Sequence, residues 1–452
     1  MSCQQEKPTA LEISEAIRTH RQSVSDVVDN YLARIESENE FHHAFKSVFA
    51  DDARRQARVL DEELDAGKSR GPLHGIPIAV KDNIDIAGQS ATAGSLARRA
   101  TVATADAPVI ERLRAAGAVI IGQTHMVEFA FGGWGTNSAM GTPRNPLDRL
   151  HHRVPGGSSS GSAVAVAADL APLALGTDTG GSVRIPAAMT GLVGFKPSWG
   201  LTPDEGLTTL CRRFDVIGPM SRNVADCWAL FDVMTAAPGS EARKLPVLDR
   251  PLRIGVADPV AYGSFSARVL SAFREVCQLL SRRGLALEPF AFPVDVNEVL
   301  TRTGCLIGHE AAREFGETLS AKPCSLDRGV HYRLSDARRF TPDDYEREWV
   351  IRDQRSAEMR HAVAGFDALL FPTAPVLPPR LDEIIERAMP LGDLTRVVNY
   401  LDLCAMALPT QRTPEGLRHS LQVIGPKGGD HLIFALSAEI ERIVADMEGE
   451  IR

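Results

Sequence analysis

The sequence predicts an α/β protein, because helical patterns alternate with short apolar runs of strand length along its 452 residues. One such unit is a helix expected at 106–117, followed by a buried strand at 118–122. Another is an Ala/Val-rich helix at 160–169, followed by a strand at 173–176. This alternation is typical of layered folds in which some strands pair in parallel. The length alone allows one large domain or two unequal ones.

The first 70 residues have helical patterns with two recognisable starts. Thr9 with Glu12, and Ser23 with Asp26, have the spacing of a capping box, in which side chains satisfy free backbone N–H groups. A third helical pattern follows them. Because these segments contain no constellation of reactive residues, we assign them to packing.

A short apolar strand at 76–81 ends in Lys81. A lone lysine at a strand end usually extends its ammonium group to solvent. The alternative is a lysine partly desolvated at the end of a central strand, which loses its proton more readily. The sequence alone leaves both interpretations open.

The glycine-rich segment 123–146 is expected to form a wall of loop and helix over a site. Its apolar residues either line a pocket or pack in the core. Our candidates for the lining of a substrate pocket, including one residue from further along the chain, are Phe131, Gly132, Gly133, Trp134 and Leu210.

The alternation resumes after about residue 240. Residues 294–365 look mainly helical, and we expect them to be an insertion that shapes a substrate site. Around this insertion the patterns predict a strand at 252–256, a helix at 267–283, strands at 368–372 and 419–425, and a closing helix at 431–447.

Composition excludes several classes of protein. The net charge of −8 argues against a nucleic-acid surface as the main partner. Seven cysteines, an odd number without a CxxC pair, argue against a disulfide framework or a zinc site and favour a reducing cytoplasm. The polar N-terminus lacks a signal sequence, and no apolar run reaches the roughly 18 residues that a membrane span needs. We therefore expect a cytoplasmic protein.

The stretch from Pro155 to Pro186 contains two Gly-Gly-Ser turns, which end at Ser158 and Ser182. Glycine weakens helices and strands, so two such turns suggest a place where backbone approaches a ligand closely. Acyl transfer needs a nucleophile, a base and donors for an oxyanion. Ser182 could be the nucleophile, and a neutral Lys81 could accept its proton through Ser158. The alternative is that both turns are ordinary Ser/Gly loops.

An oxyanion hole could form from the backbone N–H groups of the second turn, which belong to Thr179, Gly180, Gly181 and Ser182. A competing motif, G-x-S-x-G, is present at 157–161 and would make Ser159 the nucleophile of an α/β-hydrolase. That fold needs a strand directly before the turn, and 151–155 is a poor strand. A phosphate-binding loop is also disfavoured, because no Gly-Lys-Ser/Thr follows the glycines.

At these motifs the sequence resembles the amidase signature family of serine hydrolases. The similarity is dense from about residue 70 to 235 and thin afterwards. Ser160 departs from the family pattern, since many members have glycine there. The segments that carry the resemblance are 80–83 (VKDN), 156–162 (GGSSSGS), 178–186 (DTGGSVRIP), 194–197 (GFKP) and 218–219 (GP).

The resemblance implies that Ser182 is the nucleophile, Lys81 the base and Ser158 a bridging serine that follows a cis Gly157–Ser158 peptide bond. It implies supporting roles for Gly157, Ser159, Asp178 and Arg184, and neither metal nor organic cofactor. The implied fold is a single α/β/α sandwich around a large, mostly parallel mixed sheet. We therefore expect one domain, 1–452, made of N-terminal helices (1–70), the signature core (70–235) and the helical insertion (294–365).

The function expected from these residues is hydrolysis of C–N amide bonds in small molecules through a serine acyl-enzyme. One alternative is a carbamate (urethane) or ureide hydrolase with the same chemistry. A second is the A-type subunit of an amidotransferase that acts on charged tRNA and needs partner subunits. A catalytically inactive binding protein is the last. We expect a small-molecule amide or carbamate as partner, no nucleic acid, no membrane, and a monomer or homodimer.

Overall fold

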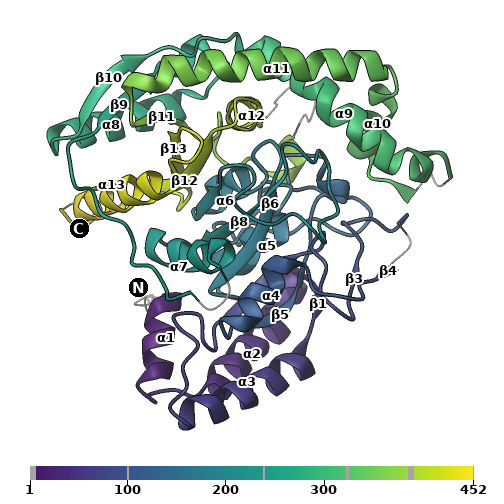
Figure 1. Cartoon of the computed structure of the whole chain (residues 1–452), viewed down its shortest axis with the longest axis vertical. Helices are drawn as coiled ribbons and strands as arrows, with labels where there is room; N and C mark the ends of the chain where they lie inside the picture. Colours follow the sequence, from purple (N-terminus) through teal and green to yellow (C-terminus); the bar gives the residue numbers. More distant parts are fainter. Residues whose placement is uncertain (1–6, 99–100, 238–239, 322–324, 385–390, 451–452) are drawn as a thin grey trace.

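The computed structural model describes residues 7–98, 101–237, 240–321, 325–384 and 391–450. Within this part of the chain a single large sheet has eleven strands, in the order β1-β5-β2-β6-β8-β7-β12-β13-β11-β9-β10 (Figure 1). These strands are β1 (Phe45–Val48), β2 (Pro77–Lys81), β5 (Val119–Thr124), β6 (Leu173–Asp178), β7 (Val193–Lys196), β8 (Val216–Ser221), β9 (Arg253–Ala257), β10 (Ala286–Phe290), β11 (Ala368–Pro372), β12 (Cys404–Arg412) and β13 (Arg418–Gly425). A separate small ribbon pairs β3 (Ser90–Ala91) with β4 (Thr101–Val102).

Helices cover this sheet in two groups. In one group α7 contacts β6, β7 and β8, while α13 contacts β12 and β13 and packs against α7. In the other, α5 contacts β2, β6 and β8, α6 contacts β7, β12 and β13, and the two helices contact each other. The helices are α1 (Ala10–Arg18), α2 (Val24–His42), α3 (Ala50–Asp65), α4 (Pro108–Ala115), α5 (Ser160–Ala167), α6 (Arg184–Thr190), α7 (Val224–Thr235), α8 (Ala267–Arg282), α9 (Val296–Ala321), α10 (Arg328–Ala337), α11 (Pro342–Ala362), α12 (Asp393–Tyr400) and α13 (Asp430–Glu450). The expected α/β sandwich around a mixed sheet is confirmed.

The expectation that the sheet is mostly parallel was wrong. Four pairs are parallel, namely β2–β5, β2–β6, β9–β11 and β9–β10, whereas the other six neighbouring pairs of the described sheet are antiparallel. The reason lies in the connections. Parallel neighbours need a crossover, but β12 and β13 are joined by a short turn, which forces antiparallel pairing.

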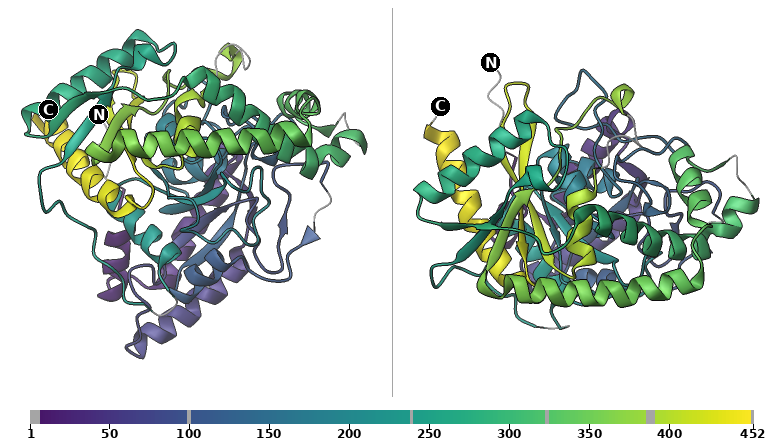
Figure 2. Two further views of the ribbon diagram at one scale, coloured as in Figure 1. Left: turned by 45° about the horizontal axis from the view of Figure 1, so that its top comes forward. Right: turned by 90° about the horizontal axis from the view of Figure 1, so that it is seen from above.

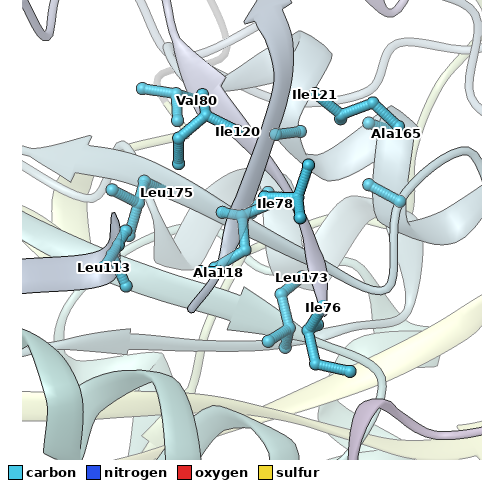
Figure 3. Close-up of a cluster of buried hydrophobic side chains, with 14 of the residues drawn as sticks. Ile76, Ile78, Val80, Leu113, Ala118, Ile120, Ile121, Ala165, Leu173 and Leu175 are labelled. Carbon is cyan, nitrogen blue, oxygen red and sulfur yellow. The ribbon is translucent and has the colours of Figure 1, made fainter. Parts of the chain in front are cut away.

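The three strands at the centre of the N-terminal half are buried on both faces. All residues of β2, β5 and β6 are buried, as is usual for strands with helices on both sides. Figure 3 shows the side chains of Ile78, Ile120 and Leu175 from these strands in one apolar cluster with Ala165 of α5. Burying such side chains contributes about 1.5–3 kcal/mol each, so this cluster holds the strand ends in place.

Parallel pairing brings the carboxyl ends of β2, β5 and β6 to one edge of the sheet. These ends carry Lys81, Thr124 and Asp178. In α/β proteins, sites form outside the carboxyl ends of such strands, where loops can converge.

The N-terminal helices start as the sequence predicts. Thr9 and Glu12 form a complete capping box at α1, and Ser23 and Asp26 form another at α2. In Figure 1, α1, α2 and α3 lie together at the end of the molecule opposite α9, α10 and α11. The segment 294–365 contains those last three helices, and Figure 2 shows α11 as a long helix across that end. Within the described chain, no helix is both long and apolar enough to cross a membrane.

Candidate active site

Lys81, the last residue of β2, is completely buried. Its Nζ donates hydrogen bonds to Ser158 Oγ at 2.8 Å and to Thr177 Oγ1 at 2.7 Å. Burial lowers the pKa of Lys81 to about 7, and the negative charges of Asp215 and Asp178 only partly oppose this shift. Of the two interpretations of this lysine, the structure supports the desolvated one.

Ser158 follows a cis Gly157–Ser158 peptide bond, as expected. The loop around it is held by backbone hydrogen bonds, from Gly157 N–H to the Gly133 carbonyl at 2.7 Å and from Val127 N–H to the Ser158 carbonyl at 3.0 Å. No side chain fits at Gly157, because a Cβ atom there would lie 2.7 Å from the Gly135 nitrogen. The wall segment predicted at 123–146 therefore packs directly against the first glycine-rich turn.

Ser182 lies in the turn between β6 and α6 and is 8% exposed. The two glycine-rich turns meet here, since Ser159 N–H donates to the Ser182 carbonyl at 3.2 Å. Among the described residues, the hydroxyls of Ser158 and Ser182 are not hydrogen-bonded to each other. The structure thus brings Lys81 and Ser158 into direct contact and joins the Ser182 turn to them through backbone.

Asp178 organises the Ser182 turn. Its carboxylate accepts hydrogen bonds from Gly181 N–H at 2.7 Å and Val183 N–H at 3.2 Å, and from both Nε and Nη2 of Arg184 at 3.0 and 2.9 Å. Burial by itself raises the pKa of Asp178, but Arg184 and these hydrogen bonds outweigh it and hold the pKa well below its usual range. Charge-assisted bonds of this kind fix a turn strongly.

The four backbone N–H groups predicted for an oxyanion hole are not equivalent. The Gly181 N–H already donates to Asp178. Within the described residues, the N–H groups of Thr179, Gly180 and Ser182 have no protein acceptor. Glycine is required at position 181, where φ is +123° and a Cβ atom would lie 2.1 Å from Thr395 Oγ1.

Asp215 is a second acid that supports the same turn. It accepts a hydrogen bond from the Thr179 hydroxyl, and another from Leu210 N–H at 2.7 Å. Burial raises the pKa of Asp215 to about 6, although these bonds oppose the shift. The candidate pocket residue Leu210 is itself buried in an apolar cluster that includes Phe129.

The remaining pocket candidates divide into two kinds. Trp134 is buried in a small apolar cluster with Ile185 and Leu391, which matches the core-packing alternative. Phe131, Gly132 and Gly133 are only partly buried. The guanidinium of Arg333 lies 5.4 Å from the centre of the Phe131 ring.

Ser159 and Ser160 are both buried in the first turn of α5 or just before it. The Ser159 hydroxyl accepts from Thr177 N–H at 3.2 Å and lies 3.3 Å from the Thr177 carbonyl, so it braces β6. This use of the hydroxyl disfavours Ser159 as a nucleophile. The Ser160 hydroxyl is buried without a hydrogen-bond partner in the described structure. Ser160 is also the position at which the sequence departs from the family pattern.

Sequence reasoning missed several residues at this site. Thr177 could have been noticed, because it directly precedes Asp178 at a strand end. Nothing in the sequence pointed to α12, whose Asn399 donates to Asp178 Oδ1 at 3.0 Å and whose Thr395 carbonyl accepts from Arg184 Nη2 at 3.0 Å. Across the described chain, no group of three or more His, Cys, Asp or Glu residues is placed to hold a metal ion.

Comparison with known proteins places these observations in a family. The family model described as Amidase matches residues 26–434. The chain is 33% identical to 2-amino-5-chloromuconic acid deaminase of Comamonas testosteroni over 409 residues, covering 89% of this chain and 88% of that protein. It is 34% identical to the A-type subunit of the glutamyl-tRNA(Gln) amidotransferase from Symbiobacterium thermophilum, covering 94% of each. A crystal structure of an amidase matches with a TM-score of 0.88 at 32% identity, covering 97% of this chain and all of the other. The chain belongs to the amidase family of amidohydrolases.

Proposed function

We propose that this protein hydrolyses C–N amide bonds of small molecules, with Ser182 as nucleophile, Ser158 as relay and Lys81 as base. The observation that carries the proposal is the 2.8 Å hydrogen bond between Lys81 Nζ and Ser158 Oγ. Because burial lowers the pKa of Lys81 to about 7, a large fraction of this amine is neutral near pH 7 and can accept a proton.

In this mechanism the Ser182 hydroxyl attacks the amide carbonyl carbon. Its proton passes to Ser158, whose own proton passes to Lys81. The tetrahedral intermediate then expels the amine, which receives a proton along the reverse route, and an ester with Ser182 remains. Water attacks this ester with the help of the same groups, which releases the carboxylic acid and restores the Ser182 hydroxyl.

The developing oxyanion is proposed to bind the N–H groups of Thr179, Gly180 and Ser182. These donors point to no acceptor within the described chain, whereas the Gly181 N–H is engaged by Asp178. Removing one oxyanion donor costs about 3 kcal/mol of transition-state stabilisation in comparable enzymes. Gly181, Asp178 and Arg184 are therefore positioning residues in this proposal.

The helical segment 294–365 is proposed to shape the substrate site as part of a single domain. Two acids support this role. Glu310 of α9 accepts from Arg212 N–H at 2.8 Å, next to the loop that holds Asp215. Glu128 of the wall accepts from Asp327 N–H, at the start of α10, at 2.6 Å. The first contact joins the insertion to the loop that supports the Ser182 turn, and the second joins it to the wall that packs against the Ser158 turn.

The substrate class can be identified by measuring the hydrolysis of anilides, primary amides, aryl carbamates and ureides by the purified chain. Preference for carbamates or ureides would favour that alternative within the same chemistry. The similarity to the A-type subunit of an amidotransferase supports a second candidate, a protein that works on charged tRNA together with partner subunits. Efficient amide hydrolysis by the isolated chain, without partners, would argue against it.

The nucleophile is tested by replacing Ser182 with alanine. We expect loss of hydrolysis of every substrate in the panel, with an unchanged circular dichroism spectrum and melting temperature. In parallel, a fluorophosphonate should add to the wild-type protein at Ser182, as located by peptide mass spectrometry. Near-normal turnover by Ser182→Ala, or labelling at another residue, would refute the assignment.

A further inference from the structure

Arg396 of α12 lies beside the turn that contains Ser182. It directly follows Thr395, whose hydroxyl donates to the Gly180 carbonyl at 2.7 Å. A Cβ atom placed on Gly180 would lie 2.9 Å from Arg396 Cγ and 3.7 Å from Arg396 Nε. The stem of Arg396 therefore packs on the backbone whose N–H groups we assign to the oxyanion.

The guanidinium of Arg396 makes neither a hydrogen bond nor an ion pair with any described residue. Asp393, one helical turn earlier, is close enough to act on Arg396 electrostatically but forms no ion pair with it, and Asp393 Oδ1 is buried without a hydrogen-bond partner in the described structure. Burial raises the pKa of Asp393, and the positive charge of Arg396 partly opposes this shift. Arg396 is thus a partly buried cation whose donors are available.

Arg184, which directly follows the same turn, is an example of an arginine whose guanidinium is fully used in structural contacts. Its guanidinium donates to Asp178 and Gln422, and also to the Thr395 carbonyl and Asn399 Oδ1. Removing a guanidinium from water without such partners is costly. Since Arg396 has no such partner among the described residues, a ligand with a matching charge would offset that cost.

The surroundings of Arg396 add to its positive field. Its pKa is lowered by burial, opposed by Asp393, and lowered further by the positive charge of Arg333 on α10. Arg333 itself borders the wall, because a Cβ atom on Gly132 would lie 3.0 Å from Arg333 Nη2. Two cations from separate helices therefore lie near the candidate site.

We propose that Arg396 binds a carboxylate of the substrate, so that the preferred amides carry a second, acidic group. This inference rests on the proposed function, since it concerns the substrate of the Ser182 site. A guanidinium matches a carboxylate through two parallel N–H···O hydrogen bonds. Arg396 is then a specificity-determining residue that holds the substrate without reacting.

The test compares matched pairs of amides. Malonamate, succinamate and glutaramate each carry a carboxylate, and propionamide, butyramide and valeramide are neutral amides of the same chain lengths. The wild type should prefer at least one acid over its neutral partner by about tenfold to a hundredfold in kcat/KM, the range expected for a charge-assisted contact. Arg396→Gln should lose this preference mainly through KM and leave the neutral amides within about threefold.

Two further variants make the outcome specific. Arg396→Lys keeps the positive charge but loses the planar pair of N–H donors, and it should retain part of the preference for acidic amides. Arg18→Gln removes an exposed arginine that pairs with Glu15 on its own helix, and it should not change the preference for acidic amides. If Arg396→Gln slows acidic and neutral amides equally, Arg396 contributes to packing or to the oxyanion, and the proposal is wrong.

Binding separates this inference from the proposed function. If the wild type hydrolyses neutral amides, Ser182→Ala abolishes that activity and no acid is preferred, the amidase proposal stands and the carboxylate proposal fails. If no amide is hydrolysed, calorimetric titration of succinamate and glutaramate into wild type and Arg396→Gln decides. Binding that requires Arg396 supports the carboxylate site, whereas absent binding, or equal binding to both, overturns it.

Discussion

Among the described residues, two lysines are buried at strand ends, and the groups to which they donate hydrogen bonds differ. Lys81 ends β2 and Lys196 ends β7, and burial lowers the pKa of both, to about 7 and about 8. Lys81 donates to two hydroxyls. Lys196 donates to the backbone carbonyls of Pro197 and Leu403, at 2.7 and 2.8 Å.

The partners determine what each lysine can do. A hydroxyl both accepts and donates, so Ser158 can deliver a proton to a neutral Lys81. A carbonyl only accepts, so the two bonds of Lys196 need its N–H groups and offer no proton in return. The comparison teaches that burial and a lowered pKa do not identify a catalytic base without a neighbour that can supply the proton.

The largest expected difference is between Lys81→Met and Lys196→Met. Loss of Lys81 should reduce kcat/KM by a factor on the order of 10²–10⁴, the contribution of a general base. Loss of Lys196 leaves two buried carbonyls unpaired and should lower the free energy of unfolding by about 1–3 kcal/mol per carbonyl, with activity retained in the folded fraction. Steady-state kinetics and urea unfolding measure both. An active Lys81→Met variant would contradict the role of Lys81 as the base and with it the proposed functional difference between the two lysines.

A second pair of variants compares the adjacent serines. Ser158→Ala removes the relay between Lys81 and the proposed nucleophile, and should reduce kcat by about a hundredfold or more. Ser159→Ala removes a hydroxyl that braces Thr177 and should cost about 1 kcal/mol of stability, with activity within about tenfold of wild type. If Ser159→Ala is instead the inactive variant, the roles assigned to Ser158 and Ser159 are wrong.

The pH dependence follows from the lowered pKa of Lys81. Since only neutral Lys81 is a base, kcat/KM should fall about tenfold per pH unit below pH 7 and level off above it. The stability effect has the same sign. The unfolded lysine, with its ordinary pKa of 10.5, keeps its proton up to a higher pH than the folded one, so the free energy of unfolding should rise between pH 7 and 10.5. A flat activity profile from pH 5 to 8 would contradict a lysine base.

The smallest expected effect is that of Thr177→Val. This change removes one of the two acceptors of Lys81 and should lower kcat/KM by roughly threefold to tenfold, with the midpoint of the pH profile at a lower pH. Thr124→Val is the matched control, because Thr124 is a buried threonine at the end of β5 whose hydroxyl bonds to Ser162 at 2.8 Å. Equal effects of both variants would mean that only packing is measured.

Much of the architecture was predictable because it depends on local chemistry. The capping boxes at Thr9 and Ser23, a helix beginning at Ser160, the strand ending in Lys81 and a strand beginning at Leu173 follow from spacing and apolar runs, although that last strand continues to Asp178 rather than ending at residue 176. The antiparallel majority of strand pairs was not predictable in this way. Which strands become neighbours depends on how side chains are buried across the whole sheet. The sequence of any one strand does not reveal this pairing.

The residues that could react were determined by the sequence itself. Lys81, Ser158 and Ser182, with the glycines that precede the two serines, form a motif that can be recognised from the sequence alone. Only the tertiary structure decided how these residues are supported. Burial lowers the pKa of Lys81, and Asp215 accepts a hydrogen bond from Thr179. Helix α12 places Asn399 and Arg396 against the Ser182 turn. The physical reason is that a side chain's chemical type is a local property, whereas its desolvation and its hydrogen-bond partners come from distant segments, as with Asn399, which is 221 residues from Asp178 along the chain.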